Sequence, residues 1–311
     1  MSQINVFEAN IDDEYKGFFG LWRLFLQLKK ENFAAVVDVH DNLRTKILRS
    51  FFKLLGTKVV VFDKGRKEKK AMVRKNNKVR TILPHTTERY AMAFAKTLYF
   101  LNIKTIISDT ENPLKNGILS QNVPIFGFLS KNFEKKLFSV GIAPFAKHET
   151  KQWGLLNIIA LIDIFIKKEP KTTIYLFGGG AAEIAELEKI KVLFDENVEI
   201  AAGKYTMQQE IELMQTLDFM LCMDSSNLHL AALAGVKTVS IWGATHPDIG
   251  FSPYGKSEQH LLIQTDIDEM PCRPCSVFGN KPCHRNDKMC MSMITPERVF
   301  MDLILNFSIQ I

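Results

Sequence analysis

Short apolar runs alternate with amphipathic stretches along most of this chain of 311 residues. The apolar runs are too short for helices, and the stretches between them repeat apolar residues at helical spacing. This pattern predicts βαβ units and largely parallel sheets. In the carboxyl-terminal part it predicts strands at 137–144, 173–177, 198–201, 219–223 and 238–242, and helices at 155–167, 182–193, 207–217 and 227–234. Together these elements predict a nearly complete Rossmann-like domain.

The amino-terminal part follows the same alternation over fewer elements, with helices predicted at 18–30, 43–55 and 88–100 and strands at 34–40 and 58–62. Prolines and glycines between residues 112 and 136 are typical of a linker. The fold class is therefore α/β with two Rossmann-like parallel-sheet domains, assigned to residues 1–130 and 131–311. The second domain carries a cysteine-rich loop at 270–291 and a closing helix at 296–307, which we expect to pack back toward the first.

Composition fits a folded chain with two cores, because 46% of the residues are hydrophobic. No apolar run reaches the roughly 18 residues of a membrane span. The first residues lack the basic and apolar regions of a signal peptide, so we expect a cytoplasmic chain.

The net charge of +6 is concentrated in residues 64–80, which hold nine Lys or Arg and one acid. A charge run of this kind is either a solvated basic helix and loop or a surface for an anionic partner. Nucleic acid, lipid headgroups and a phosphorylated glycolipid are the anionic partners that such a surface could take.

A candidate ligand site follows the strand predicted at 219–223. Asp224 ends that strand, and Ser225 and Ser226 are residue types that begin a helix. Ligands of open α/β sheets bind beyond the carboxyl ends of strands, where the positive helix terminus suits a diphosphate. Asp224 could accept hydrogen bonds from sugar hydroxyls, and His229 could donate one. The alternative is an ordinary capped helix with His229 packed against its neighbours.

The same segment carries a family resemblance. The sequences DSSNLHLAA at 224–232 and GATHP at 243–247 resemble the carboxyl-domain signature of glycosyltransferase family 9, the ADP-heptose:lipopolysaccharide heptosyltransferases. Further matches are PFA at 144–146 with KQW at 151–153, and FGGG at 177–180. The motifs occur in the family's order, and the resemblance covers most of the chain. It implies a GT-B-like fold.

The resemblance also implies an activity, which is inverting transfer of heptose from ADP-heptose, or a similar nucleotide sugar, to the lipopolysaccharide inner core at the inner-leaflet surface. No cofactor is required for this chemistry. The helix terminus at Ser225 and Ser226 and the Lys151 ammonium would meet the leaving-group charge, and Glu183 would bind the ribose. The remaining implied donor-site residues are Ala146, Lys204 and Tyr205.

The chain departs from the family pattern in three ways. Phe145 and Ser226 stand where the family usually has glycine, and no Gly-Asp dipeptide, whose aspartate is the family's catalytic base, occurs in the sequence. The chain starts at what resembles the third strand region, so the first lobe lacks its first βα units and is either truncated or rebuilt. Truncation is the expectation we favour. Asp38, His40 and Asp41 lie at the carboxyl end of a predicted strand and could orient the acceptor or take its proton, or could simply cap the next helix.

Four clustered cysteines remain to be placed, Cys272, Cys275, Cys283 and Cys290. In a cytosolic chain their spacing allows structural zinc, reduced thiols in a packed loop, or disulfides. Cys222 lies in an apolar run and is predicted to be in the core.

Besides the glycosyltransferase, two alternatives stay open. A catalytically silent ADP-sugar-binding module is consistent with the missing Gly-Asp turn. A zinc-loop protein that holds nucleic acid through the basic run is the third, although we do not expect nucleic acid as a partner.

Overall fold

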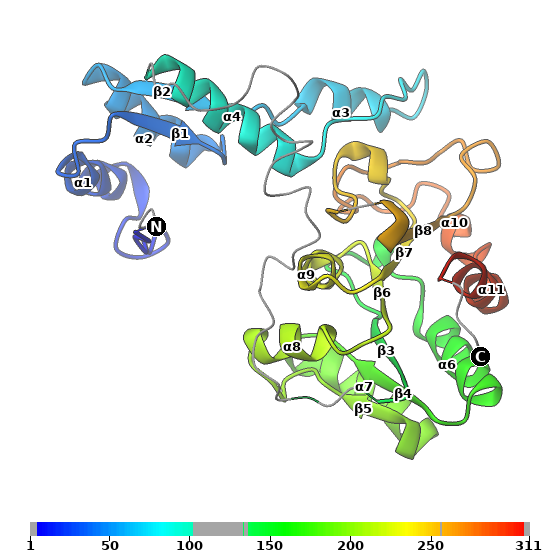
Figure 1. The fold of residues 1–311 in the computed structure, drawn as a ribbon. Helices are drawn as coiled ribbons and strands as arrows, with labels where there is room; N and C mark the ends of the chain where they lie inside the picture. The colour runs from blue at the N-terminus through cyan, green and yellow to red at the C-terminus, as the bar shows by residue number, and fades with distance from the viewer. Residues whose placement is uncertain (1–4, 102–132, 134–135, 256, 308–311) are drawn as a thin grey trace. The chain divides into compact units, whose positions relative to one another are not determined.

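The computed structural model describes residues 5–101, 133, 136–255 and 257–307, and its elements are labelled in Figure 1. The chain divides into two compact units, Met1–Arg66 with Pro84–Leu114, and Lys67–Leu83 with Lys115–Ile311. The domain boundary predicted at residues 130/131 lies outside the described residues.

The amino-terminal unit has the elements that the sequence predicts, with ends shifted by a few residues. They are α1 (Gly17–Lys29), β1 (Ala35–Asp38), α2 (Leu43–Leu54), β2 (Lys58–Val61) and α4 (Thr86–Phe100). The two strands pair in parallel, Ala35 beside Lys58. Aromatic rings join α1 to α2, with Trp22 and Phe51 in an edge-to-face contact at 4.9 Å. Asn42 caps α2 in a capping box with Thr45.

Residues 67–83 differ from the prediction, because they pack with the carboxyl-terminal unit rather than the amino-terminal one. Helix α3 (Arg66–Met72) leads into this segment. The Lys78 ammonium donates to the carbonyls of Cys272 and Pro274, and the Lys69 ammonium lies 4.1 Å from the centre of the Phe251 ring. Part of the basic run is therefore used for internal contacts and is not available to an anionic partner.

Six parallel strands form the sheet of the carboxyl-terminal unit in the order β5-β4-β3-β6-β7-β8. The strands are β3 (Phe138–Ala143), β4 (Thr172–Leu176), β5 (Val198–Ile200), β6 (Phe219–Met223), β7 (Thr238–Trp242) and β8 (His260–Gln264). In chain order this is 3-2-1-4-5-6, the doubly wound arrangement. Its topological switch point lies between β3 and β6, where successive crossovers leave in opposite directions along the sheet. Sequence reasoning missed β8.

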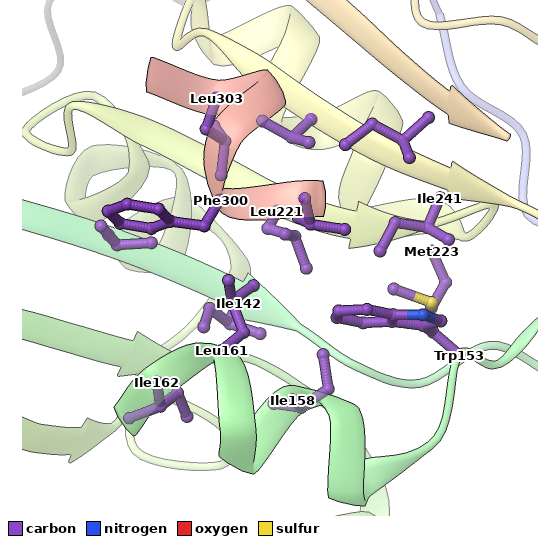
Figure 2. Packing of buried hydrophobic residues seen from close by; sticks show 14 of the residues in the cluster. Ile142, Trp153, Ile158, Leu161, Ile162, Leu221, Met223, Ile241, Phe300 and Leu303 are labelled. Carbon is purple, nitrogen blue, oxygen red and sulfur yellow. The ribbon is translucent and has the colours of Figure 1, made fainter. Parts of the chain in front are cut away.

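Helices cover both faces of this sheet, which explains why its strands read as continuous apolar runs. On β6, Phe219, Leu221 and Met223 join one buried cluster, and Met220 and Cys222 join another. The first cluster is drawn in Figure 2, where Trp153 lies among strand residues and residues of α6. The helices of the unit are α6 (Leu155–Lys168), α7 (Gly180–Phe194), α8 (Met207–Met214), α9 (Ser226–Ala234), α10 (Met289–Ser292) and α11 (Pro296–Phe307).

The closing helix α11 packs on α6 and β8 of its own unit, and its packing toward the amino-terminal lobe stays a prediction. Its Phe300 ring lies 5.3 Å from Phe165 of α6, and Phe307 lies 6.4 Å from Phe219 of β6. The residues of α11 that are buried in this packing are Val299, Phe300, Leu303 and Phe307. In the described part of the chain, no helix combines the length and the apolar character that crossing a membrane requires.

Candidate functional site

A pocket of about 610 Å³ opens at the switch point of the carboxyl-terminal sheet. The segments that follow β3, β4, β6, β7 and β8 all contribute to its wall. Carboxyl ends of parallel strands meet at one edge of a sheet, and ligands of doubly wound folds bind there. The volume is in the range of small-molecule sites. Most of the residues that the sequence selected line it, namely Ala146, Lys151, Glu183, Asp224, Ser225, Ser226 and His229.

An ion pair lies in the wall of this pocket. The Lys151 ammonium is 3.1 Å from Asp224 Oδ2, and both side chains are largely buried, at 13% and 9% exposed. Thr245, which follows β7, donates its hydroxyl to the same carboxylate oxygen at 2.7 Å. Gly279, at φ +78°, lies against the Lys151 stem, where a Cβ would come within 2.5 Å of Lys151 Cγ. The ammonium is thus held in one place and keeps donors for an anion.

The first turn of α9 faces the same pocket. Ser225 is the N-cap residue, yet its side chain makes no capping bond, so it leaves the first backbone N–H groups of α9 without the bond a cap supplies. Its hydroxyl oxygen is buried and has no hydrogen-bond partner among the residues that the structure describes. A buried polar atom of this kind calls for an explanation, and a ligand oxygen at the helix terminus supplies one.

Glu183, in the first turn of α7, also lines the pocket. Its Oε2 accepts from the Gly179 N–H at 2.8 Å, which leaves its second oxygen for a ligand hydroxyl. Gly180, the first residue of α7, has φ +78°, so the turn at 178–180 depends on glycine. The loop and helix start that the sequence predicted here are confirmed.

Three apolar residues complete the wall, and sequence reasoning assigned none of them a role: Phe251, Val277 and Phe278. Phe145, which the sequence singled out as a departure from the family pattern, lines the pocket beside them. Thr245 was part of a quoted motif but received no function. A signal for Thr245 existed, since it follows the strand next to the one that Asp224 ends. Phe251 and Phe278 come many residues after the ends of β7 and β8, and no short sequence pattern marks them.

Lys204 and Tyr205 are not among the residues that line this pocket. Lys204 lines a second hollow of about 490 Å³, formed by α7 and the segment after β5. The Tyr205 ring packs edge-to-face on Phe133 at 5.1 Å. The structure therefore gives the donor-site role of this pair no geometric support.

The three candidate catalytic residues of the amino-terminal unit, Asp38, His40 and Asp41, lie at the end of β1 and just after it, and the two aspartates are held by arginines. Arg49 Nη1 lies 2.7 Å from Asp38 and 2.8 Å from Asp41, and Arg66 lies 2.5 Å from Asp41. Burial by itself would raise the pKa of both carboxyls. Hydrogen bonds outweigh this effect and lower the pKa: Asp38 accepts them from backbone N–H groups and from Arg49, and Asp41 accepts them from both arginines. Such carboxylates are weak proton acceptors. His40 is exposed and gives its backbone N–H to Asp38, while the helix cap is Asn42.

All five cysteines are free thiols, so the disulfide alternative is wrong. All four clustered cysteines belong to the described residues, and among those residues no three His, Cys, Asp or Glu side chains are arranged to hold a metal ion. The structural zinc that the spacing allowed therefore has no ligand set here. Arg273, between Cys272 and Cys275, is fully buried and holds the loop through bonds to the ends of β7 and β8.

These thiols should differ in reactivity. Burial raises the pKa of Cys290 to about 11 and also raises the pKa of Cys222. Because the thiolate is the nucleophile, iodoacetamide at pH 8 should leave both unmodified while it labels Cys272 and Cys283, which are partly exposed. Peptide mass spectrometry measures the labelling, and a parallel sample with EDTA should give the same result. Equal rates at Cys290 and Cys283, or labelling that depends on EDTA, would contradict this description of the loop.

The doubly wound sheet, the helix terminus without a capping bond and the lysine held at the switch point are features typical of sites for phosphorylated ligands. A family model described as "Glycosyltransferase family 9 (heptosyltransferase)" matches residues 21–277. The chain belongs to this family.

Curated relatives agree with this assignment at low identity. Lipopolysaccharide heptosyltransferase 1 of Campylobacter coli is 25% identical over 236 residues, which are 72% of this chain and 65% of the relative. Lipooligosaccharide heptosyltransferase 2 of Campylobacter jejuni is 29% identical over 212 residues, which are 66% of this chain and 60% of the relative. The chain thus spans less than two thirds of the length of these relatives.

Solved structures share the fold. A glycosyl transferase family 9 protein from Veillonella parvula has a TM-score of 0.62 at 14% identity, covering 95% of this chain and 80% of that one. The E. coli heptosyltransferase WaaC with ADP has a TM-score of 0.59 at 17% identity, covering 96% of this chain and 79% of that one. These similarities confirm the predicted GT-B-like fold.

Proposed function

We propose that the carboxyl-terminal unit binds an ADP-sugar donor and that the chain takes part in transfer of the sugar, heptose in the first instance, to a lipopolysaccharide inner-core acceptor. The observation that carries the proposal is a pocket lined by the Lys151–Asp224 pair and the first turn of α9, together with the buried hydroxyl of Ser225. The titles of two solved neighbours name ADP and a fluorinated ADP-heptose as their ligands, and the curated relatives are named for lipopolysaccharide or lipooligosaccharide.

The chemistry of the pocket suits departure of a diphosphate. In an inverting transfer, an acceptor hydroxyl attacks the anomeric carbon while the bond from that carbon to the diphosphate oxygen breaks. Negative charge then grows on the leaving diphosphate, and the Lys151 ammonium and the N–H groups of α9 would stabilise it without rearrangement. Asp224 keeps the ammonium in place, and Glu183 would accept from ribose hydroxyls. We expect these donors to bind the diphosphate without a metal ion, as the family resemblance implies.

With this acceptor, the sugar would be transferred at the surface of the inner leaflet, on its cytoplasmic side. The described basic side chains that remain exposed in the segment after residue 66 are suited to an acidic glycolipid, and they are Lys67, Lys70, Arg74, Lys75 and Arg80.

A catalytically silent donor-binding module is the second candidate. The carboxylates considered as bases, Asp38 and Asp41, have lowered pKa values and arginine partners. Among the sequence candidates, this leaves the exposed His40 as the group that could take the acceptor proton. The silent module and the enzyme share the donor pocket and differ only in turnover.

The experiment that separates them is incubation of the chain with ADP-heptose and lipopolysaccharide that lacks core heptose. The enzyme should release ADP and increase the acceptor mass by one heptose residue, and the Lys151→Met variant should not. Donor binding without a mass increase supports the silent module. A chain that is folded but does neither refutes both candidates.

A further inference from the structure

The pocket wall contains two aromatic rings that neither the diphosphate nor the ribose accounts for. Phe251 and Phe278 lie 5.7 Å apart between ring centres, with an angle of 35° between their planes. Both line the pocket. Phe278 is 56% exposed, so much of its ring is open to a ligand in the pocket.

Separate parts of the chain hold this aromatic pair in place. Phe251 follows β7 and belongs to a cluster around Met72, Leu83 and Ile249. The Lys69 ammonium, on a side chain that is 8% exposed, lies 4.1 Å from the Phe251 ring centre. A buried cation over a ring face is attracted by the negative potential of that face, so this contact helps to fix the orientation of the ring.

Phe278 is positioned by the cysteine-rich loop. The next residue, Gly279, accepts a hydrogen bond from Thr150 at 2.6 Å, and it packs on the stem of Lys151. Phe278 is therefore tied to the residue that would bind the diphosphate. Its ring stands next to the leaving group rather than at an unrelated surface.

The order of the strands indicates which part of a donor the rings would meet. Glu183 and the glycine turn follow β4, the α9 terminus follows β6, and the two rings follow β7 and β8. Neighbouring strands are about 4.8 Å apart. A ligand that is laid along this edge with its ribose at β4 and its diphosphate at β6 carries its next group toward β7 and β8. In a nucleoside diphosphate sugar, that group is the sugar that is transferred.

We propose that Phe251 and Phe278 form a stacking platform for the C–H face of the transferred sugar ring. This inference rests on the proposed function and adds a determinant of donor choice to it. Aromatic faces carry negative potential, and the C–H groups of a pyranose face carry the complementary positive edge. The platform selects donors whose transferred ring offers such a face, and it contributes little to a nucleotide without a sugar.

Calorimetric titrations with ADP and with ADP-heptose test the platform directly. Phe278→Ala should bind ADP within twofold of the wild-type chain and bind ADP-heptose about tenfold more weakly, as expected for the loss of one aromatic contact. Phe278→Tyr should restore ADP-heptose binding. Phe251→Leu should act in the same direction as Phe278→Ala. The matched control is Leu305→Ala, an exposed apolar residue of α11 that should change neither affinity.

Any result other than a selective loss of ADP-heptose binding contradicts the platform. Equal loss of ADP and ADP-heptose binding would show that the rings contact the nucleotide, and no loss for either ligand would show that they contact nothing. In both cases ADP binding that depends on Lys151 would leave the proposed function standing. A wild-type chain that binds neither nucleotide would overturn the proposed function and the platform together.

Discussion

Replacing Lys151 by methionine should weaken ADP binding roughly 30- to 150-fold. The reason is that a charge-assisted contact to a phosphate is worth about 2–3 kcal/mol. The substitution also leaves the Asp224 carboxylate without its cation, so a nearby phosphate would meet uncompensated negative charge. Isothermal titration calorimetry measures the change.

Lys189→Met is the control for this variant. Lys189 forms an exposed surface pair with Glu186 on α7 and should bind ADP as the wild-type chain does. Thermal melting of Lys151→Met should be recorded as well, because Asp224 keeps only its hydrogen bond from Thr245. An unchanged affinity in a folded Lys151→Met chain would remove this lysine from the donor site.

Replacing Arg273 by methionine should give the largest loss of stability of the variants discussed. The guanidinium is fully buried and donates to the carbonyls of Gly243, Trp242, Thr245 and Thr265 and to the Gln264 side chain. Methionine would leave these acceptors without a donor, at a cost of about 3–5 kcal/mol. The melting temperature of the carboxyl-terminal unit should fall by roughly 10 °C.

Differential scanning calorimetry checks this result against Arg298→Met. Arg298 donates to the main chain of the same Gln264 at 3.0 Å, but from an exposed position on α11, so its loss should cost less than about 1 kcal/mol. Because Arg273 also holds the carbonyl of Thr245, Arg273→Met should weaken ADP binding. Equal melting temperatures for the two variants would show that the buried arginine does not hold the loop.

Most of the fold could be predicted because the central strands of the carboxyl-terminal sheet are buried on both faces and leave apolar runs, as β6 does. The edge strand β8 was not predicted, and it is only partly buried. The packing of residues 67–83 and of α11 could not be predicted, since these segments are joined to their partners by long-range contacts. Lys78 reaches a loop almost 200 residues away in the chain.

The residues of the candidate site also fall into those that the sequence could predict and those that it could not. Lys151, Glu183, Asp224 and Ser225 were found because the family motifs place them at the ends of strands, where the topology brings them together. Phe251 and Phe278 were not, because their position depends on loops whose course no short pattern encodes. Asp38 and Asp41 were proposed, on position alone, to orient the acceptor or take its proton, and only the structure showed the arginines that hold them.

The central claim is that the pocket recognises a diphosphate, and it is tested most directly by comparing ADP with AMP in calorimetric titrations of the wild-type chain in the presence of EDTA. We predict one ADP bound per chain and an affinity at least tenfold higher than that for AMP, since the second phosphate adds contacts to Lys151 and to α9 worth about 1.4 kcal/mol or more. Equal affinities for the two nucleotides, or ADP binding that requires a divalent metal, would contradict the account.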